Sequence, residues 1–327
     1  MNLHNDTRLF RQAIQYTSDQ IQIPAIYIEK DYWVTFALYI IANAPIGKDV
    51  IFKGGTALSK CYKLIERFSE DIDLVVLRNA DETDSKLKSK LKEISNSIKN
   101  DFPEVDIKGI TRKMGMNRKT AHSYKKLFSG QFGQVRDILI LESSWLGYYE
   151  PFSKRNIISF IGETLEKNGQ NEPVQNYGLK SFEMNVLEPT RTICEKIMSL
   201  VRFSYTATPI QDLKNKIRHI YDIYQLLQQK EFRDFVESEA FTKMLIKVAN
   251  DDVVSFRNNN AWLINHPNES LFFKEIENLW NNELREIYTN DFKKLVYGEL
   301  PEEVKVLEKL KHLRDRMTKI KWNIKVN

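Results

Sequence analysis

Ile51-Phe-Lys-Gly-Gly-Thr-Ala-Leu-Ser-Lys60 is the stretch of this chain that decides its fold. The short apolar run from Val50 to Phe52 ends at Gly54 and Gly55, a pattern typical of a buried strand that enters a glycine turn. Thr56 is able to cap a helix, predicted over 56–66, after that turn. Backbone N–H groups exposed at such a turn favour anions, so the stretch predicts a strand, turn and helix that bind phosphate.

Two aspartates follow in the stretch Arg67-Phe-Ser-Glu-Asp-Ile-Asp-Leu-Val-Val76. Asp71 and Asp73 lie two residues apart on a predicted strand, whose period of two sends both carboxylates to one face. Mg²⁺ prefers such oxygen ligands and bridges one or two carboxylates to substrate phosphates. Each pattern alone has an ordinary explanation, because two glycines usually form a plain turn and paired aspartates usually lie on the surface. Their order and spacing favour one site for a metal and a phosphate.

Strand, glycine pair, helix and a second strand with paired aspartates resemble the active-site signature of the nucleotidyltransferase superfamily. The stretches Lys53–Lys60 and Arg67–Leu74 are similar to the AbiEii/MenT toxin family in particular, and the resemblance extends from about Glu29 to Asp222. It implies an α/β (α+β) fold with a nucleotidyltransferase-like mixed sheet and flanking helices. A helical C-terminal domain is implied to close over the cleft.

The resemblance also implies an activity, which is Mg-dependent transfer of NMP from NTP to an acceptor, in this family the 3′ end of tRNA. The protein would then be the toxin of a toxin–antitoxin or abortive-infection phage-defence system, with a cognate antitoxin protein as partner. Two alternatives remain open. One is transfer of NMP to a protein or small molecule, and the other is a non-catalytic nucleotide-binding interaction module. Intact Asp71 and Asp73 argue against the second alternative.

Site residues follow from the same resemblance, carried over position by position. The NTP phosphates are expected to contact Gly54, Gly55, Thr56, Lys60, Ser69 and Lys196. The divalent cation, Mg²⁺ or Mn²⁺, is expected to bind Asp71, Asp73 and Glu142. The catalytic residues are expected to be Asp71, Asp73, Glu142, Lys196 and Asp222.

Glu142 lies near the end of the last of three further predicted strands, which are Val105–Thr111, Ser123–Phe128 and Gln134–Ser143. It follows an apolar run in the predicted strand Gln134 to Ser143, and a carboxylate at the end of a buried strand needs a reason. The ordinary explanation is a strand end that faces water. Nucleotidyltransferase folds carry a third carboxylate on a neighbouring strand, which favours Glu142, with Asp137 as the alternative third ligand.

Lys196 and Asp222 lie on predicted helices in the second half of the chain. The first helix is predicted to begin at Pro189. The second is predicted to begin within Thr208-Pro-Ile-Gln211, and on it Lys214, Arg218 and Asp222 are spaced by four residues. The ordinary interpretation is a surface ion pair between Arg218 and Asp222. The resemblance implies instead that the lysine meets the triphosphate and that the aspartate helps to orient it.

A basic segment runs from Lys108 to Lys126. It contains seven cations and no acidic residue, with His122 and Tyr124 between them. Charged runs are usually solvated loops, but this one lies in the half of the chain that carries the aspartates. The cations predict contacts to nucleic-acid phosphates, and Tyr124 is expected to stack on a base of an RNA. The resemblance implies that this RNA is tRNA.

Composition bounds these interpretations. The 327 residues are 42% hydrophobic, which is enough for a packed core, and the formal net charge of +5 permits a polyanionic partner. Only two cysteines occur, and the longest mostly apolar stretch is too short to span a bilayer. We therefore expect a cytoplasmic protein without membrane segments. The expected domains are a nucleotidyltransferase domain with N-terminal helices at 1–185 and a mainly helical domain at 186–327.

Overall fold

The computed structural model describes residues 1–79, 81–113, 115–129, 136–146 and 149–326. The chain divides into two compact units. The first unit consists of Met1–Lys63, Phe68–Trp145 and Phe152–Leu187. The second unit consists of Leu64–Arg67, Leu146–Pro151 and Glu188–Asn327. The second unit therefore includes a short segment that ends four residues before Asp71 in the chain.

A mixed sheet forms the centre of the first unit, in the order β3-β4-β5-β2-β1-β7-β6 among the described residues. Its strands are β1 (Val50–Lys53), β2 (Ile72–Val76), β3 (Glu104–Val105), β4 (Asn117–His122), β5 (Leu139–Ser144), β6 (Phe152–Ile157) and β7 (Phe182–Leu187). Strand β1 is antiparallel to β2 and parallel to β7, while β2 is parallel to β5. The mixed α+β architecture is the predicted one.

Buried apolar runs account for the central strands. Val50, Ile51 and Phe52 are fully buried, as a strand covered on both faces requires. The strands predicted at 105–111 and 123–128 are wrong, because the chain instead pairs at β3 and at the polar β4. The predicted strand Gln134 to Ser143 begins later, at Leu139, and its residues 134 and 135 lie outside the described part of the chain.

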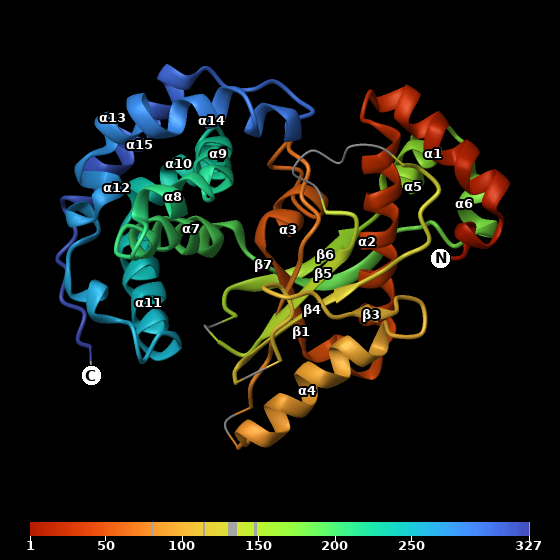
Figure 1. Ribbon diagram of the computed structural model, residues 1–327, viewed down its shortest axis with the longest axis horizontal. Helices are drawn as coiled ribbons and strands as arrows, with labels where there is room; N and C mark the ends of the chain where they lie inside the picture. The colour runs from red at the N-terminus through yellow and green to blue at the C-terminus, as the bar shows by residue number, and fades with distance from the viewer. Residues whose placement is uncertain (80, 114, 130–135, 147–148, 327) are drawn as a thin grey trace. The chain divides into compact units, whose positions relative to one another are not determined.

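Six α-helices accompany the sheet in the described part of the first unit (Figure 1). They are α1 (Thr7–Ile21), α2 (Ala25–Asn43), α3 (Gly54–Lys60), α4 (Asp84–Ser97), α5 (Phe160–Lys167) and α6 (Asn171–Asn176), with the 3₁₀ turns η1 (Leu3–Asn5) and η2 (Pro45–Asp49). Helix α3 ends at Lys60, before the predicted position 66. Lys63 has a positive φ of 54°, which a continuing right-handed helix does not accept.

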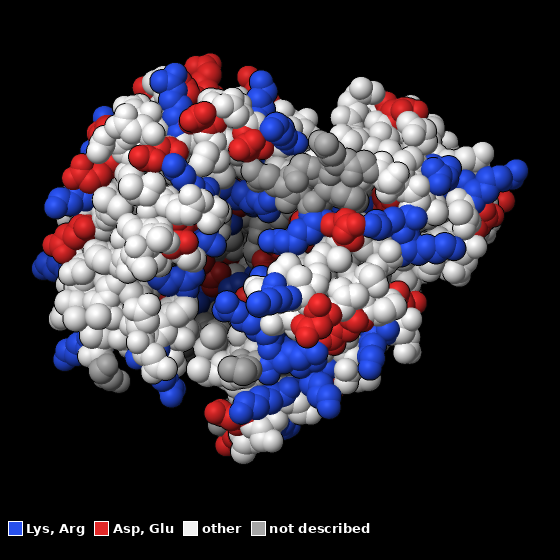
Figure 2. Space-filling model, viewed as in Figure 1, with Lys and Arg blue, Asp and Glu red and all other residues white. Residues whose placement is uncertain are grey.

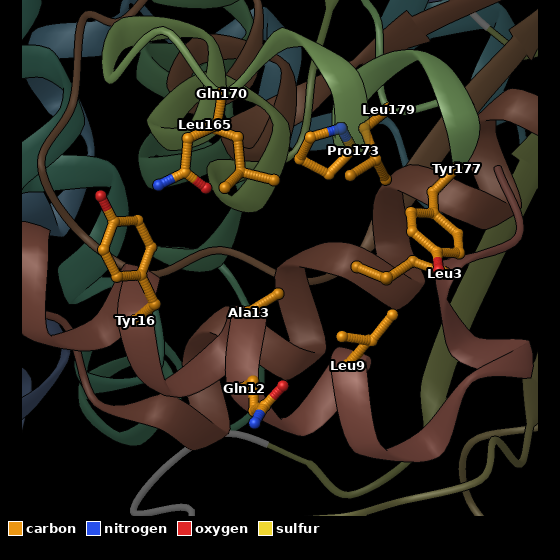
Figure 3. Close-up of a pocket in the computed structure, with 10 residues that line it drawn as sticks. All are labelled: Leu3, Leu9, Gln12, Ala13, Tyr16, Leu165, Gln170, Pro173, Tyr177 and Leu179. Atoms are coloured by element: carbon orange, nitrogen blue, oxygen red, sulfur yellow. The ribbon is translucent and has the colours of Figure 1, made fainter.

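A small cavity of about 260 Å³ lies between α1, α5 and α6. Figure 3 shows Leu9, Tyr16, Leu165 and Tyr177 among the side chains around it, most of which are apolar. None of the residues predicted to bind phosphate or metal lines this cavity. The cavity is therefore a feature of helix packing that is separate from the predicted site.

Helices make up most of the second unit. They are α7 (Pro189–Phe203), α8 (Pro209–Lys214), α9 (Ile217–Leu226), α10 (Lys230–Glu237), α11 (Glu239–Ser255), α12 (Leu271–Lys274), α13 (Ile276–Leu279), α14 (Arg285–Thr289) and α15 (Glu303–Met317), with turns η3 (Ala261–Ile264), η4 (Pro267–Glu269), η5 (Trp280–Leu284) and η6 (Phe292–Leu295). Helix α7 packs against α9 and α11, and α9 packs against α15. No described helix has the length and apolar character needed to cross a bilayer.

Candidate functional site

Four charged side chains lie level with one another on neighbouring strands of the sheet. Lys53 on β1 is opposite Asp73 on β2, and Asp73 is opposite Glu142 on β5. Glu142 is in turn opposite Lys119 on β4. Directly paired residues on a sheet are close neighbours, so the strand register alone brings Asp73 and Glu142 together between two lysines.

The environment of Asp73 disfavours its negative charge. Burial, the charge of Asp71 and the charge of Glu142 raise the pKa of the Asp73 carboxyl to about 7. Glu142 differs, because Lys119 and Asn117 hold its carboxylate at 3.0 Å and 2.9 Å. Burial by itself would raise the pKa of Glu142, but these partners bring it below its usual value. A cation between Asp71 and Asp73 would relieve their repulsion.

This repulsion predicts a pH dependence of stability in the metal-free protein. The pKa of Asp73 is higher in the folded state, at about 7, than in an unfolded chain, at about 3.9. The folded protein therefore binds the extra proton, and the stability contributed by that proton is complete below about pH 4 and lost as pH rises through about 7. Chemical denaturation between pH 4 and 8 should show this loss in the wild type and a flatter profile in Asp73→Asn. Equal profiles would contradict the assigned repulsion.

Gly54 allows the Asp73 carboxylate to take its position. Its φ is +82°, in the left-handed region that favours glycine. A Cβ atom at residue 54 would also overlap with Oδ2 of Asp73. The glycine at this position therefore serves two purposes, a turn into α3 and close approach to a carboxylate.

Gly54→Ala should lower the free energy of unfolding by about 2–5 kcal/mol, because left-handed strain and overpacking both act there. Gly169→Ala is the matched control, since Gly169 has a similar φ of +71° and a Cβ added there would meet no atom within 4 Å. It should cost only the backbone strain, about 1–2 kcal/mol. Equal losses in urea denaturation would show that Asp73 does not restrict residue 54.

Thr56 connects α3 to the segment just before β2, which contains Ser69 and Asp71. Its hydroxyl lies 2.9 Å from Oγ of Ser69 and donates to the backbone carbonyl of Asp71 at 2.6 Å. The expectation that Thr56 caps the helix is wrong, because α3 begins at Gly54 and Lys53 is its N-cap. The buried Thr56 instead fixes the backbone of Asp71, while Ser69 remains partly exposed beside it.

Asp71 and Asp73 together provide the donor set that a magnesium ion prefers. Mg²⁺ commonly takes one or two carboxylates from the protein and its other ligands from phosphates and water. Among the described residues, the structure forms no group of three His, Cys, Asp or Glu side chains around one metal position. Glu142 is engaged by Lys119, and Asp137 forms an ion pair with Lys126. The two aspartates therefore fit a divalent cation, and Glu142 as third ligand stays a prediction.

Helix α2 contributes charged residues whose importance the sequence did not reveal. Glu29 accepts hydrogen bonds from the backbone N–H groups of Leu127 and Phe128. Asp31 pairs with Lys60 and accepts from the N–H of Phe160 at 2.8 Å. The buried ammonium of Lys60 thus contacts Asp31 in this structure, and its role at phosphate stays a prediction. Three charges on an otherwise apolar helix were the signal for this network.

In the second unit, Asp222 joins two cations. Its carboxylate accepts from Nε and Nη2 of Arg67 at 2.7 Å each and pairs with Nζ of Lys196 at 2.7 Å. Asp222 is fully buried, and the charges of Arg67 and Lys196 overcome the effect of burial and hold its pKa far below its usual value. The ordinary interpretation of Asp222 as half of a surface pair is wrong. Arg67 is a partner that the sequence did not indicate.

The cations of the basic segment 108–126 differ in their exposure to solvent. Lys108, Arg112, Lys113, Lys125 and Lys126 are exposed. Arg118 is partly buried and donates to Ser95 on α4, and Lys119 belongs to the row of charges on the sheet. Figure 2 shows Lys and Arg gathered on the face over α4 and its neighbouring strands. The stacking prediction for Tyr124 is wrong, because its ring is buried against Trp33 with Lys30 over it.

Comparisons with known proteins find a matching family model and a similar solved fold. A family model described as "Nucleotidyl transferase AbiEii toxin, Type IV TA system" matches residues 37–311. Among solved structures, the fold is similar to MenT4, a nucleotidyltransferase toxin from Mycobacterium tuberculosis. That match has a TM-score of 0.55 and 14% sequence identity, and it covers 94% of this chain and 90% of the other. At this identity the likeness shows the fold. A comparison with curated proteins finds no match.

Proposed function

We propose a reaction for this protein from one premise, which is that the chain belongs to the AbiEii family of nucleotidyltransferase toxins in type IV toxin–antitoxin systems. The protein is accordingly a nucleotidyltransferase, an enzyme of the EC 2.7.7 type. We infer that it moves NMP from NTP to the 3′ end of tRNA, and that this reaction is its toxic activity. The observation that carries the proposal is the pair Asp71 and Asp73 beside the tightly packed glycine turn at Gly54.

Different residues of the chain have different roles in the proposed reaction. Asp71 and Asp73 hold Mg²⁺ or Mn²⁺, which supplies positive charge to the NTP phosphates. Backbone N–H groups at Gly54 and Gly55 contact the triphosphate, with Ser69 beside them. Lys196 offers a compact charge to the pyrophosphate as it leaves, and Asp222 orients that lysine.

The proton of the attacking hydroxyl needs an acceptor near the metal pair. Asp73 suits this task by its position, because it belongs to the metal pair and lies opposite Glu142 on the neighbouring strand. The oxygen of the tRNA hydroxyl attacks the α-phosphorus, its proton passes to the carboxylate of Asp73, and pyrophosphate departs. Glu142 lies opposite Asp73 and forms an ion pair with Lys119. Its proposed role is therefore electrostatic, because its charge acts on the nearby Asp73 carboxylate.

The exposed cations of segment 108–126 support a nucleic-acid acceptor. We infer that Lys108, Arg112 and Lys125 contact tRNA phosphates, because all three are exposed on a segment without acidic residues. Changing these three to Ala should weaken RNA binding. The slope of log affinity against log salt should fall by about two to three, because fewer counterions are released. NTP affinity should stay unchanged.

The control variant changes Lys180, Lys243 and Lys325 to Ala, which removes three other exposed cations. It should leave the salt slope at the wild-type value in the same filter-binding titration. If both variants behave alike, net charge and not the segment determines RNA binding. If the first variant loses NTP affinity, the segment belongs to the nucleotide site.

Transfer of NMP to a protein or small molecule is the second candidate acceptor class. A partition experiment separates the two: the enzyme is incubated with α-labelled NTPs and either total cellular RNA or a protein lysate. The proposal expects label in RNA of tRNA size and none in protein. Label in protein alone would show that the acceptor is a protein and not tRNA. The family implies a cognate antitoxin as a further partner, and we infer that it acts in the cytoplasm with the toxin.

A further inference from the structure

Arg136 holds one of the two metal-binding aspartates. Its Nη1 donates to Oδ1 of Asp71 at 3.1 Å, and both side chains are partly exposed, at 44% for Arg136 and 32% for Asp71. An ordinary surface pair of this exposure is loosely held and contributes little. The backbone around Arg136 shows that this pair is held differently.

A buried ion pair forms hydrogen bonds to both the N–H and the carbonyl group of Arg136. Lys30 and Glu70 lie 3.2 Å apart, and their side chains are 0% and 3% exposed. Nζ of Lys30 donates to the carbonyl of Arg136 at 2.8 Å and also to that of Ile138. Glu70 accepts from the N–H of Arg136 at 2.9 Å. A buried lysine whose N–H groups serve two backbone carbonyls and a buried carboxylate fixes the position from which the guanidinium extends.

The charges around Asp71 indicate the role of Arg136. Asp71 and Asp73 repel each other, and the guanidinium supplies one positive charge to Asp71. A divalent cation supplies two and would compete with the guanidinium for the same carboxylate. Once released, a guanidinium at the edge of a metal site has the forked geometry that matches phosphate oxygens.

We propose that Arg136 is a further nucleotide-binding residue, which pairs with Asp71 until the divalent cation displaces it and then binds the triphosphate of the NTP. The inference rests on the proposed function, because it requires the metal at Asp71. It explains why Lys30 and Glu70 are buried next to a site on the sheet. It also leaves Asp71 paired with a cation in both states, with the arginine in one and the metal in the other.

The first test measures Mn²⁺ binding to the full chain without nucleotide, by electron paramagnetic resonance of free Mn²⁺. Arg136→Gln should bind Mn²⁺ tighter than the wild type by about fivefold, because a competing charge worth about 1 kcal/mol is removed. Arg155→Gln is the control, since it removes another exposed arginine of the first unit. It should leave Mn²⁺ affinity unchanged. Unchanged or weaker Mn²⁺ binding in Arg136→Gln overturns the competition.

The second test measures NTP binding at saturating Mn²⁺ with a non-hydrolysable analogue. Arg136→Gln should bind the analogue more weakly, by about tenfold, and Arg136→Lys should recover part of the loss. Equal affinity in Arg136→Gln and wild type overturns the binding role. Asp71→Ala separates this failure from that of the proposed function: loss of Mn²⁺ binding in Asp71→Ala supports the metal site whatever Arg136 does. Retained Mn²⁺ binding in Asp71→Ala overturns both.

Discussion

Asp71→Asn is expected to reduce nucleotide transfer at least about a thousandfold, because an amide lacks the charge that joins the cation to the phosphates. The charge stabilisation supplied by a bound metal amounts to several kcal/mol, and each 1.36 kcal/mol corresponds to a factor of ten in rate. The rate is measured with α-labelled NTP and tRNA at saturating Mg²⁺. Any growth inhibition by the toxin should disappear in the same variant.

Stability should hardly change in Asp71→Asn. Loss of the ion pair with the partly exposed Arg136 costs about 0–1 kcal/mol, and relief of the repulsion between Asp71 and Asp73 offsets this cost. Asp19→Asn, which alters an exposed aspartate on α1, is the control and should transfer nucleotide at the wild-type rate. Transfer by Asp71→Asn within a few-fold of wild type would remove Asp71 from the metal site.

Asp222→Ala is expected to lower the free energy of unfolding by about 3–5 kcal/mol, because it leaves the buried Arg67 and the buried Lys196 without their shared carboxylate. The loss is measured by urea denaturation at pH 7. The pKa of Asp222 is lower in the folded state than in the unfolded chain. The stability it contributes is therefore present above about pH 4 and lost as pH falls below that value.

Two further variants identify the cause of this loss. Glu183→Ala removes the exposed partner of Lys154 and should change stability by less than about 0.5 kcal/mol. A triple variant with Arg67→Met, Lys196→Met and Asp222→Leu removes all three charges and should recover most of the stability, while losing activity. If the triple variant is as unstable as Asp222→Ala, the packing around Asp222 and not uncompensated charge explains the loss.

The strands at the centre of the sheet were predictable because local sequence determines them. Val50 to Phe52 is apolar on both faces and ends at a glycine whose conformation few other residues adopt. Strand β4, which lies between the edge strand β3 and β5, was not predictable, because Asn117-Arg-Lys-Thr-Ala-His122 lacks the alternation of a half-buried strand. Its place in the sheet depends on pairing with β5, which local propensity does not encode.

The charged contacts of the site also include some that local sequence predicts and others that it does not. The prediction that Asp71 and Asp73 share a face uses the period of a strand, but β2 begins at Ile72, one residue after Asp71. The ion pair of Arg67 with Asp222 joins residues 155 positions apart, and no local spacing indicates it. The i+4 pattern through Lys214 and Asp222 predicted one continuous helix, but α8 ends at Lys214 and α9 begins at Ile217. A pattern of surface spacing therefore gave no information about a buried carboxylate.

We propose that this enzyme transfers NMP from NTP to the 3′ hydroxyl of tRNA. The most direct test uses one NTP labelled either at the α-phosphate or at the γ-phosphate, with intact tRNA and with tRNA whose 3′ diol has been oxidised by periodate. If the proposed reaction is correct, only the α label should enter intact tRNA, and neither label should enter oxidised tRNA. Transfer of the γ label, or α label on oxidised tRNA, would contradict it.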